Sequence, residues 1–258
     1  MTSTLTAASR TAFEIAPPVA RVELRHPPLN IIDIPMMEEL GHVLSEIESR
    51  QDIAMITFRG EGKAFSAGVD VAAHTPAKVE EMLSKFHGVI RALVTANKVT
   101  IAAVHGHCLG GGAELAMVCD IVYTTEDAQW GFPEIKLGCY PPVACAALAA
   151  LVGQKRASEL ILTGRTMSGK TAAQIGLATE AVGDPCAAVE QCVGNLLQLS
   201  PAALSVTKKA LYAWDSIHFD KGLARAEKTY FDELMKTSDA HEGIRAFMEK
   251  RPPKWTGR

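Results

Sequence analysis

Apolar and polar residues follow two different periods along the first half of the chain. Residues 20–24 alternate singly, whereas residues 53–59 and 99–104 are almost continuously apolar. Single alternation is typical of a half-buried strand, and a short apolar run is typical of a strand buried on both faces of a parallel sheet. Residues 36–50 and 78–96 instead place apolar side chains three and four positions apart, as amphipathic helices do. Strands alternating with helices predict an α/β fold with crossover connections.

The second half of the chain changes from strands to helices. Short strands are predicted at 120–125 and 128–131, around a turn. Helical patterns then begin at Val143, Lys155, Ser168, Pro185, Ser200 and Asp215 and continue almost to the C-terminus. The alanine-rich stretch 143–152 is the longest apolar run and predicts a buried helix. We therefore expect an α/β core over residues 1–198 and a C-terminal helical region over residues 199–258.

The N-terminal residues 1–13 contain Ser, Thr and one Arg but no acidic residue. A transit peptide would carry repeated arginines, and a secretory signal would carry a longer apolar segment. A frayed tail is therefore the prediction for this segment.

Composition narrows the class of protein. The 258 residues are 48% hydrophobic and 21% charged, as in an ordinary globular protein, which is long enough to bury a large core. A net charge of -3 gives no support for a nucleic-acid partner, and no run reaches the roughly 18 apolar residues of a membrane span. The six cysteines form no C-x-x-C pair, so we expect buried, reduced thiols in a cytoplasmic protein.

The most informative segment is a glycine triplet, Gly110-Gly111-Gly112, that is followed by strong helix formers. Glycines there let the backbone approach a ligand, and the free N–H groups at a helix start suit a developing negative charge. Glu114 follows in the first turn, which adds a possible acid or base. A plain structural turn is the alternative. The phosphate-binding patterns G-x-x-x-x-G-K-[ST] and G-x-G-x-x-G are absent here.

Two further segments read as functional. Residues 67–70 follow a strand, so a backbone N–H near Val69 could point to the end of the sheet. Pro133 sets a rigid turn just before a second carboxylate, Glu134. His105 and His107 form an x-His-x-His pair, but no acidic or cysteine partner has metal-ligand spacing, so no metal site is predicted.

These motifs resemble the enoyl-CoA hydratase/isomerase (crotonase) superfamily. The similarity is nearly continuous in FSAGVD at 65–70 and in VTIAAVHGHCLGGGAELAMVCDIVYTTEDAQWGFPEIKLG at 99–138, and it extends more weakly from PPLNIID at 27–33 to AFMEKRPPKW at 246–255. The resemblance implies a spiral of ββα units with a C-terminal helical trimerisation region, often assembled as a dimer of trimers. It also implies an acyl-CoA thioester substrate, with coenzyme A as part of that substrate and no other cofactor.

The resemblance carries specific roles onto this sequence. Val69 N–H and Gly111 N–H would form the oxyanion hole, and Glu114 and Glu134 would be the catalytic acid–base pair. Members that isomerise mainly retain the glutamate that corresponds to Glu134, so the presence of both favours a hydro-lyase. Residues implied to bind substrate are Ala67, Gly68, Asp70, Gly110, Tyr140 and Pro142, together with Phe247 and Lys250 for the CoA phosphates.

The acyl group is indicated only by one departure from the common hydratase pattern. The run YPPVA at 140–144, with PPLNIIDIPMMEEL at 27–40, is similar to hydratases of cyclohexa-1,5-diene-1-carbonyl-CoA. Proline and small side chains there would widen the pocket for a ring. A short-chain enoyl-CoA hydratase, a branched acyl-CoA dehydratase, a Δ-isomerase and a non-catalytic CoA-binding scaffold remain alternatives.

Several nearby residues favour structural roles. Asp120 is expected to serve as a cap or ion-pair partner, and Asp70 to cap the next turn. Trp130 is expected in the core, whereas Tyr140 fits a pocket wall and a core position equally well. His74 lies in a predicted loop, where exposure to solvent is the expectation. The basic residues near the C-terminus, Lys250 among them, could equally form a solvated tail.

Overall fold

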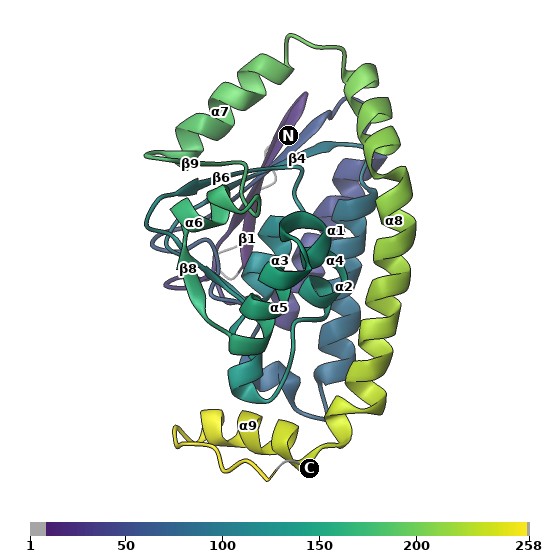
Figure 1. The fold of residues 1–258 in the computed structure, drawn as a ribbon. Coiled ribbons are helices and arrows are strands. Elements are labelled where there is room, and N and C mark those ends of the chain that lie inside the picture. The colour runs from purple at the N-terminus through teal and green to yellow at the C-terminus, as the bar shows by residue number, and fades with distance from the viewer. Residues whose placement is uncertain (1–8, 257–258) are drawn as a thin grey trace.

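A six-stranded sheet forms the centre of the computed structural model, which describes residues 9–256 and omits the side chains of residues 212–218 (Figure 1). The strand order is β1-β2-β3-β4-β6-β9, and every neighbouring pair is parallel except the β1–β2 hairpin. The strands are β1 (Thr11–Ala16), β2 (Val19–Leu24), β3 (Met55–Gly60), β4 (Val99–Val104), β6 (Ile121–Thr125) and β9 (Glu180–Val182).

A second, smaller sheet lies beside the first, and the strands in the middle of the chain alternate between the two sheets. It contains β5 (His107–Leu109), β7 (Gln129–Gly131) and β8 (Thr166–Ser168). Strand β4 leads into β5 and strand β6 leads into β7, so successive turns of the chain add one strand to each sheet. A bridge between Ser66 and Cys108 joins the preceding turn in the same way. The predicted α/β spiral of ββα units is therefore confirmed.

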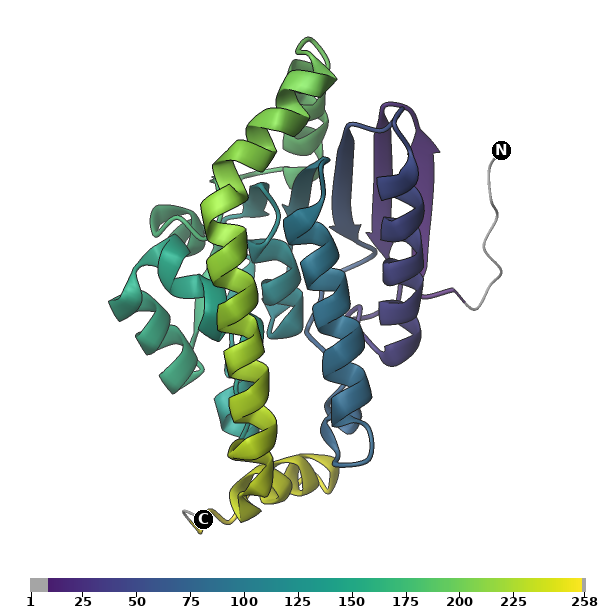
Figure 2. The ribbon, with the colours of Figure 1, turned by 90° about the vertical axis from the view of Figure 1, so that its right-hand side faces the viewer.

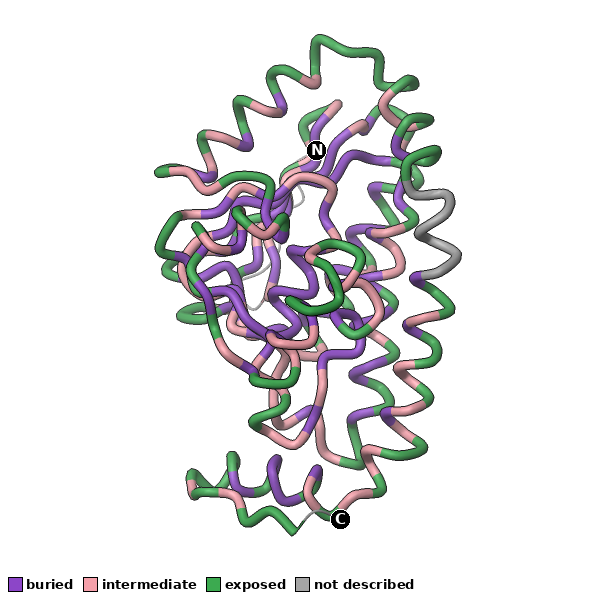
Figure 3. The backbone as a smooth tube through the Cα atoms, viewed as in Figure 1, coloured by how far each residue is buried: buried purple, intermediate pink, exposed green. Residues whose placement is uncertain are grey.

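The two faces of the main sheet bury different side chains because strand residues alternate in direction. On β4, Val99, Ile101 and Ala103 pack against α7 (Pro185–Leu196). The opposite face packs against α1 (Ile34–Ser49) and α2 (Val79–Thr95). The long helix α8 (Pro201–Asp232) lies against α2, on the side away from α1 (Figure 2). Figure 3 shows the buried positions concentrated in the strands, while α7 buries only one side.

The remaining helices are short. They are η1 (Val71–His74), α3 (Gly111–Met117), η2 (Pro133–Leu137), α4 (Pro142–Val152), α5 (Gln154–Thr163), α6 (Gly169–Gln174), η3 (Leu234–Lys236) and α9 (Ser238–Met248). The small helix η2 contacts both α5 and α9. None of the described helices is long and apolar enough to cross a membrane.

The N-terminal tail and the last helices differ from the sequence prediction. Residues 11–13, predicted to fray, belong to β1, because the Glu39 carboxylate accepts hydrogen bonds from Arg10 and Thr11 backbone N–H groups. Residues 1–8 of that predicted tail lie outside the described residues. The helices predicted to start at Ser200 and Asp215 are one continuous helix, α8.

The alanine-rich helix and the cysteines are less buried than predicted. Helix α4 buries Val143, Ala144 and Leu148, but Leu151 is 44% exposed. Cys108, Cys119 and Cys139 are buried, whereas Cys145 is exposed and Cys186 and Cys192 are half-buried. Alanine does not define an apolar stripe, so the sequence pattern could not show that only one side of α4 is covered.

An ion pair holds α8 against the N-terminal ends of the central strands β4 and β6. Lys208 Nζ lies 2.8 Å from Asp120 Oδ2, and Asp120 also accepts hydrogen bonds from the Thr100 N–H and hydroxyl at the start of β4. Both charged side chains are largely buried, with exposed fractions of 6% and 13%. The predicted structural role of Asp120 is confirmed, and Trp130 is fully buried as predicted.

Replacement of Lys208 by methionine is expected to lower the free energy of unfolding by about 3–5 kcal/mol, because it leaves a buried Asp120 charge without its cation. Urea denaturation measures this difference. The matched control is Lys209→Met on the exposed side of the same helix, which should change stability by less than about 0.5 kcal/mol. Equal losses in the two variants would show that the ion pair contributes nothing.

Candidate active site

The glycine triplet forms the sharp turn between β5 and α3, and two other segments, residues 66–69 and η2, lie against it. Gly110 has φ +52 and ψ -129, a conformation that a side chain disfavours. A Cβ on Gly111 would lie 2.6 Å from Val69 Cγ2, and a Cβ on Gly112 would lie 2.6 Å from the Ser66 carbonyl oxygen. The triplet is needed because the Ser66 backbone and the Val69 and Glu134 side chains occupy the space of the missing side chains.

Two backbone N–H groups meet at this contact without a protein acceptor. Within the described residues, neither Val69 N–H nor Gly111 N–H donates to a protein group. Ile32 bonds to the flanking residues instead: its N–H donates to Gly68, and it accepts from Asp70, so Val69 N–H faces away from it. Gly111 opens α3, where N–H groups lack intrahelical partners. The two donors are therefore available to an oxygen in the cavity between them.

Glu114 projects from the first turn of α3 into the same cavity. The residue is 3% exposed, and its Oε1 accepts a hydrogen bond of 2.9 Å from the Ala144 N–H at the start of α4. Burial raises the pKa of Glu114 to about 7, although hydrogen bonds from Ala144 and Val143 N–H groups oppose that rise. The start of α4 therefore orients this carboxylate while the cavity keeps it close to protonation at neutral pH.

Glu134 approaches from η2, on the other side of the glycine turn. A Cβ on Gly110 would lie 2.6 Å from Glu134 Oε1, so this carboxylate occupies the space that the glycine leaves open. The Oε2 atom is buried and has no hydrogen-bond partner within the described residues, although the residue as a whole is half-buried. Burial first, and then the Glu114 charge, raise the pKa of Glu134 to about 8. The two carboxyls therefore behave as one coupled pair.

One cavity collects most of the residues predicted to form the site. Of these, it is lined by Ala67, Gly68, Val69, Gly110, Gly111, Glu114, Glu134, Tyr140 and Pro142. Asp70 does not line it, because its side chain caps η1 through the Ala72 N–H, in line with the predicted cap. Phe247 and Lys250 are also not among the lining residues; they lie at the end of α9 and are exposed. Within one chain, the predicted CoA-phosphate contacts are therefore separate from the carboxylates.

The cavity wall also contains residues that sequence analysis did not select. They come mostly from α2, η2 and α8 and include Met82, Leu83, Phe86, His87, Leu137, Cys139 and Tyr230. Met82, Leu83 and Phe86 follow the apolar stripe of α2, which looks the same in sequence whether it covers a core or a pocket. The only feature of the sequence that could have indicated a pocket is His87, a polar residue within that apolar stripe.

The expectation that His74 is exposed was wrong. It lies in η1 and lines the cavity, and its Nδ1 is 3.1 Å from the Asp70 carbonyl oxygen. Burial lowers the pKa of His74, which favours a neutral ring that donates from Nδ1. The loop predicted here is a turn of 3-10 helix that carries the ring inward.

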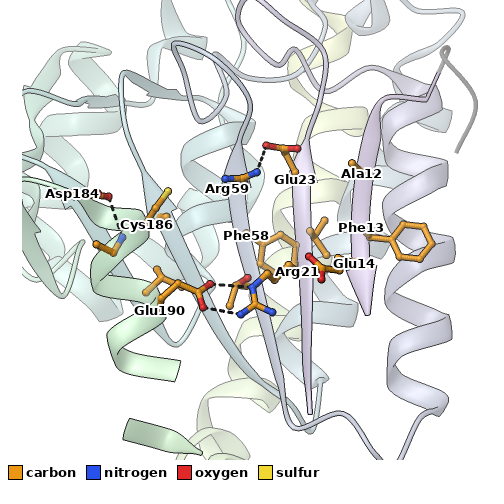
Figure 4. A pocket seen from close by; sticks show the side chains of 15 residues that line it. Ala12, Phe13, Glu14, Arg21, Glu23, Phe58, Arg59, Asp184, Cys186 and Glu190 are labelled. Carbon is orange, nitrogen blue, oxygen red and sulfur yellow. Dashed lines mark hydrogen bonds and ion pairs between the residues drawn. The ribbon is translucent and has the colours of Figure 1, made fainter. Parts of the chain in front are cut away.

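A larger cavity of about 630 Å³ lies on the other side of the main sheet, between β1–β3 and α7 (Figure 4). Its arginines are already neutralised: Arg21 forms two hydrogen bonds with Glu190, and Arg59 pairs with Glu23. The carboxylate cavity, by contrast, presents unpaired donors and a buried acceptor. Among the described residues, no three His, Cys, Asp or Glu side chains converge as metal ligands.

Known proteins are similar to this chain in sequence and in fold. The family model "Enoyl-CoA hydratase/isomerase" matches residues 14–258. The chain is 33% identical to a cyclohexa-1,5-dienecarbonyl-CoA hydratase of Thauera aromatica, covering 92% of this chain and 93% of that protein. It is 34% identical to a probable enoyl-CoA hydratase of Bacillus subtilis, covering 93% and 95%. A crystal structure of an enoyl-CoA hydratase from Mycobacterium avium subsp. paratuberculosis superposes with a TM-score of 0.85 at 25% identity, covering 96% and 98%.

The raised carboxyl pKa values predict how stability depends on pH. A carboxyl whose pKa is higher in the folded state stabilises the fold fully below its unfolded value of 4.5 and loses that contribution as pH rises through about 8. Glu134→Gln cannot ionise, so the variant should be more stable than the wild type near pH 8 by about 1–3 kcal/mol, and the difference should shrink near pH 5.

Urea denaturation at the two pH values measures the effect, and Glu126→Gln in an exposed turn is the control, for which no such difference is expected. A variant that is less stable than the wild type by the same amount at both pH values would contradict the role of Glu134 ionisation.

Proposed function

The chain belongs to the enoyl-CoA hydratase/isomerase family, and we propose that it is a hydro-lyase that uses Glu114 and Glu134 to add water across a conjugated C=C of an acyl-CoA thioester. The observation that carries this proposal is the pairing of two buried carboxyls with two unpaired backbone N–H groups in one cavity. An acid–base pair and an oxyanion site are the two elements that hydration of a thioester requires.

The thioester oxygen would lie between Val69 N–H and Gly111 N–H. As water attacks Cβ, electron density moves through Cα to this oxygen and forms an enolate. Donors that are already in place stabilise that charge without reorganisation, and loss of one such donor typically costs about 3 kcal/mol of the activation free energy. Neither N–H group has an acceptor among the described residues, so binding the substrate breaks no hydrogen bond within this part of the protein.

The two glutamates would move the protons. Burial and the Glu114 charge both raise the pKa of Glu134, so Glu134 holds the shared proton and Glu114 is the carboxylate. Glu114 accepts a proton from the water as its oxygen bonds to Cβ, and Glu134 gives its proton to Cα as the enolate collapses. The reverse steps remove water. The Ala144 N–H keeps the Glu114 carboxylate oriented throughout.

For the acyl group, we propose a cyclic dienoyl-CoA. The support is the 33% identity with the Thauera aromatica hydratase over most of both chains and the Pro141-Pro142 start of α4, which lines the cavity with compact side chains. A short-chain or branched 2-enoyl-CoA is the alternative that the same geometry accommodates.

We also propose that the chain assembles as a homotrimer or a dimer of trimers and acts in the cytoplasm. Support for assembly comes from large apolar side chains that are exposed on one chain, including Leu162, Val206 and Leu211. Support for the compartment comes from the cysteines of the structure, which are free thiols.

Glu114→Gln and Glu134→Gln are each expected to lower kcat for hydration by at least a hundredfold, because each removes one proton-transfer group. The assay follows the ultraviolet absorbance of the conjugated thioester, with crotonyl-CoA and cyclohexa-1,5-diene-1-carbonyl-CoA supplied in parallel. Faster loss of the cyclic diene would support the ring as substrate, and the opposite preference would support a short acyl chain. Activity that depended on Glu134 alone would indicate an isomerase, and CoA binding without turnover would indicate a scaffold.

Gly111→Ala is expected to lower kcat by a hundredfold or more, because the new Cβ would lie 2.6 Å from Val69 Cγ2 and push the two N–H donors apart. Gly88→Ala is the matched control, since a Cβ there meets no atom within 4 Å on the exposed side of α2. Stopped-flow measurement of both variants separates the oxyanion site from a general effect of removing a glycine. Equal activity of the two variants would argue against Gly111 as a donor.

A further inference from the structure

Two polar atoms in the catalytic cavity are not used by the proposed hydration. His87 on α2 is 0% exposed and Tyr230 on α8 is 1% exposed, and both residues line the cavity. Within the described part of the chain, His87 Nε2 and Tyr230 Oη have no hydrogen-bond partner. Buried polar atoms are rarely left without a hydrogen bond in a folded protein, and in an active site a bound ligand can supply the missing hydrogen bond.

The protonation of His87 is set by α8. His87 Nδ1 lies 2.7 Å from Glu227 Oε1, and both carboxylate oxygens of Glu227 also accept hydrogen bonds of 3.0 Å from Arg91. Nδ1 therefore donates its proton to Glu227. Burial lowers the pKa of His87, which keeps the ring neutral. The opposite edge of the ring then carries a lone pair on Nε2, which is a hydrogen-bond acceptor only.

Tyr230 supplies the complementary donor on the same side of the cavity. It lies three residues after Glu227 on α8, so the two side chains share one helix face. Its ring packs edge-on against Tyr140, with centroids 5.2 Å apart, which fixes its direction. Tyr140 itself donates its hydroxyl to the Ala226 carbonyl oxygen, whereas the Tyr230 hydroxyl lies beside the Cys139 thiol and has no oxygen or nitrogen partner among the described residues.

We propose that His87 and Tyr230 form a hydroxyl-binding subsite, and that the natural acyl group carries a hydroxyl beyond its reacting double bond. The ligand O–H would donate to His87 Nε2, and its oxygen would accept a hydrogen bond from Tyr230 O–H. A purely hydrocarbon acyl group would leave both protein atoms unpaired. This inference rests on the proposed function, because it assumes that the acyl group enters this cavity.

Beside His87 the wall is apolar, whereas the Cys139 thiol lies beside the Tyr230 hydroxyl. Met82, Leu83 and Phe86 lie on the same stretch of α2 as His87 and line the cavity with it. A carbon skeleton would contact these side chains, while its single hydroxyl would reach the polar pair. The chemistry of the wall therefore selects an otherwise apolar acyl group with one hydroxyl, and it disfavours a second carboxylate, which His87 Nε2 could only repel.

The test measures binding of unreactive, saturated thioesters by isothermal titration calorimetry. The pairs are hexanoyl-CoA with 6-hydroxyhexanoyl-CoA, and cyclohexanecarbonyl-CoA with 4-hydroxycyclohexanecarbonyl-CoA. In at least one pair the wild type should bind the hydroxylated member at least tenfold more tightly, since a site built for a hydroxyl discriminates strongly against its absence. Tyr230→Phe removes a hydroxyl whose neighbour is only the weakly hydrogen-bonding Cys139 thiol, so it should fold normally, and it should reduce that ratio to near one.

His87→Phe should reduce the ratio in the same way, and Arg91 continues to pair with Glu227 in that variant. Tyr140→Phe is the matched control: it makes the same chemical change in the same wall, but to a hydroxyl that is already bonded, so the ratio should persist. Equal or tighter binding of the plain member of both pairs by the wild type, or an unchanged ratio in Tyr230→Phe, would overturn the proposal.

The binding ratio does not depend on turnover. If the wild type failed to hydrate any conjugated thioester but kept a tenfold ratio that Tyr230→Phe abolished, the hydratase function would fail and the subsite would stand. If the wild type hydrated plain conjugated thioesters but showed no preference for the hydroxylated ligands, the hydratase function would stand and the subsite would fail.

Discussion

The close contact between the glycine turn and two other segments is the constraint on which the site depends. The Ser66 carbonyl oxygen lies against Gly112, the Val69 side chain lies against Gly111, and the Glu134 carboxylate occupies the space beside Gly110. Each contact is closer than a side chain would permit, so any larger residue must displace either an N–H donor or a carboxylate. The small sheet of β5, β7 and β8 holds these segments in register, because the bridge from Ser66 to Cys108 and the β5–β7 pairing join all three. The catalytic geometry thus depends on glycine backbone that packs directly against the Ser66 backbone and the Val69 and Glu134 side chains.

The same packing buries the carboxyls and thereby sets their chemistry. Desolvation is the largest cause of the raised pKa of both Glu114 and Glu134. A more open site would return each pKa toward 4.5, where neither carboxyl could donate a proton at neutral pH. Burial of the two carboxyls therefore lowers the stability of the fold above neutral pH. It also provides an acid and a base at the same pH. A strained or costly feature of this kind is expected where function requires it.

Sequence patterns predicted the parts of the molecule that are long or chemically distinctive. The strands β3 and β4, the helices α1 and α2, and the glycine turn with Glu114 and Glu134 all carry a clear period or motif. The three-residue strands β5 and β8 are too short to show a period, and β5 was absorbed into the predicted glycine loop. Helix α8 has no single apolar stripe, because its neighbours change along its 32 residues, so it was predicted as two helices.

The cavity wall shows a deeper limit of sequence patterns. His87 occupies a buried position on α2, where the pattern calls for an apolar residue, and Glu227 lies 140 positions further along the chain. Only the contact between α2 and α8 brings the two side chains together, and the hydrogen bond to Glu227 places the ring proton on His87 Nδ1. The partnership has two consequences at once: it couples α8 to the helix that covers the main sheet, and it leaves an acceptor facing the cavity. Because the long-range contact that joins the two helices also sets the polarity of the pocket, a change in α8 far from the carboxylates can alter which acyl group the site accepts while leaving the glycine turn intact.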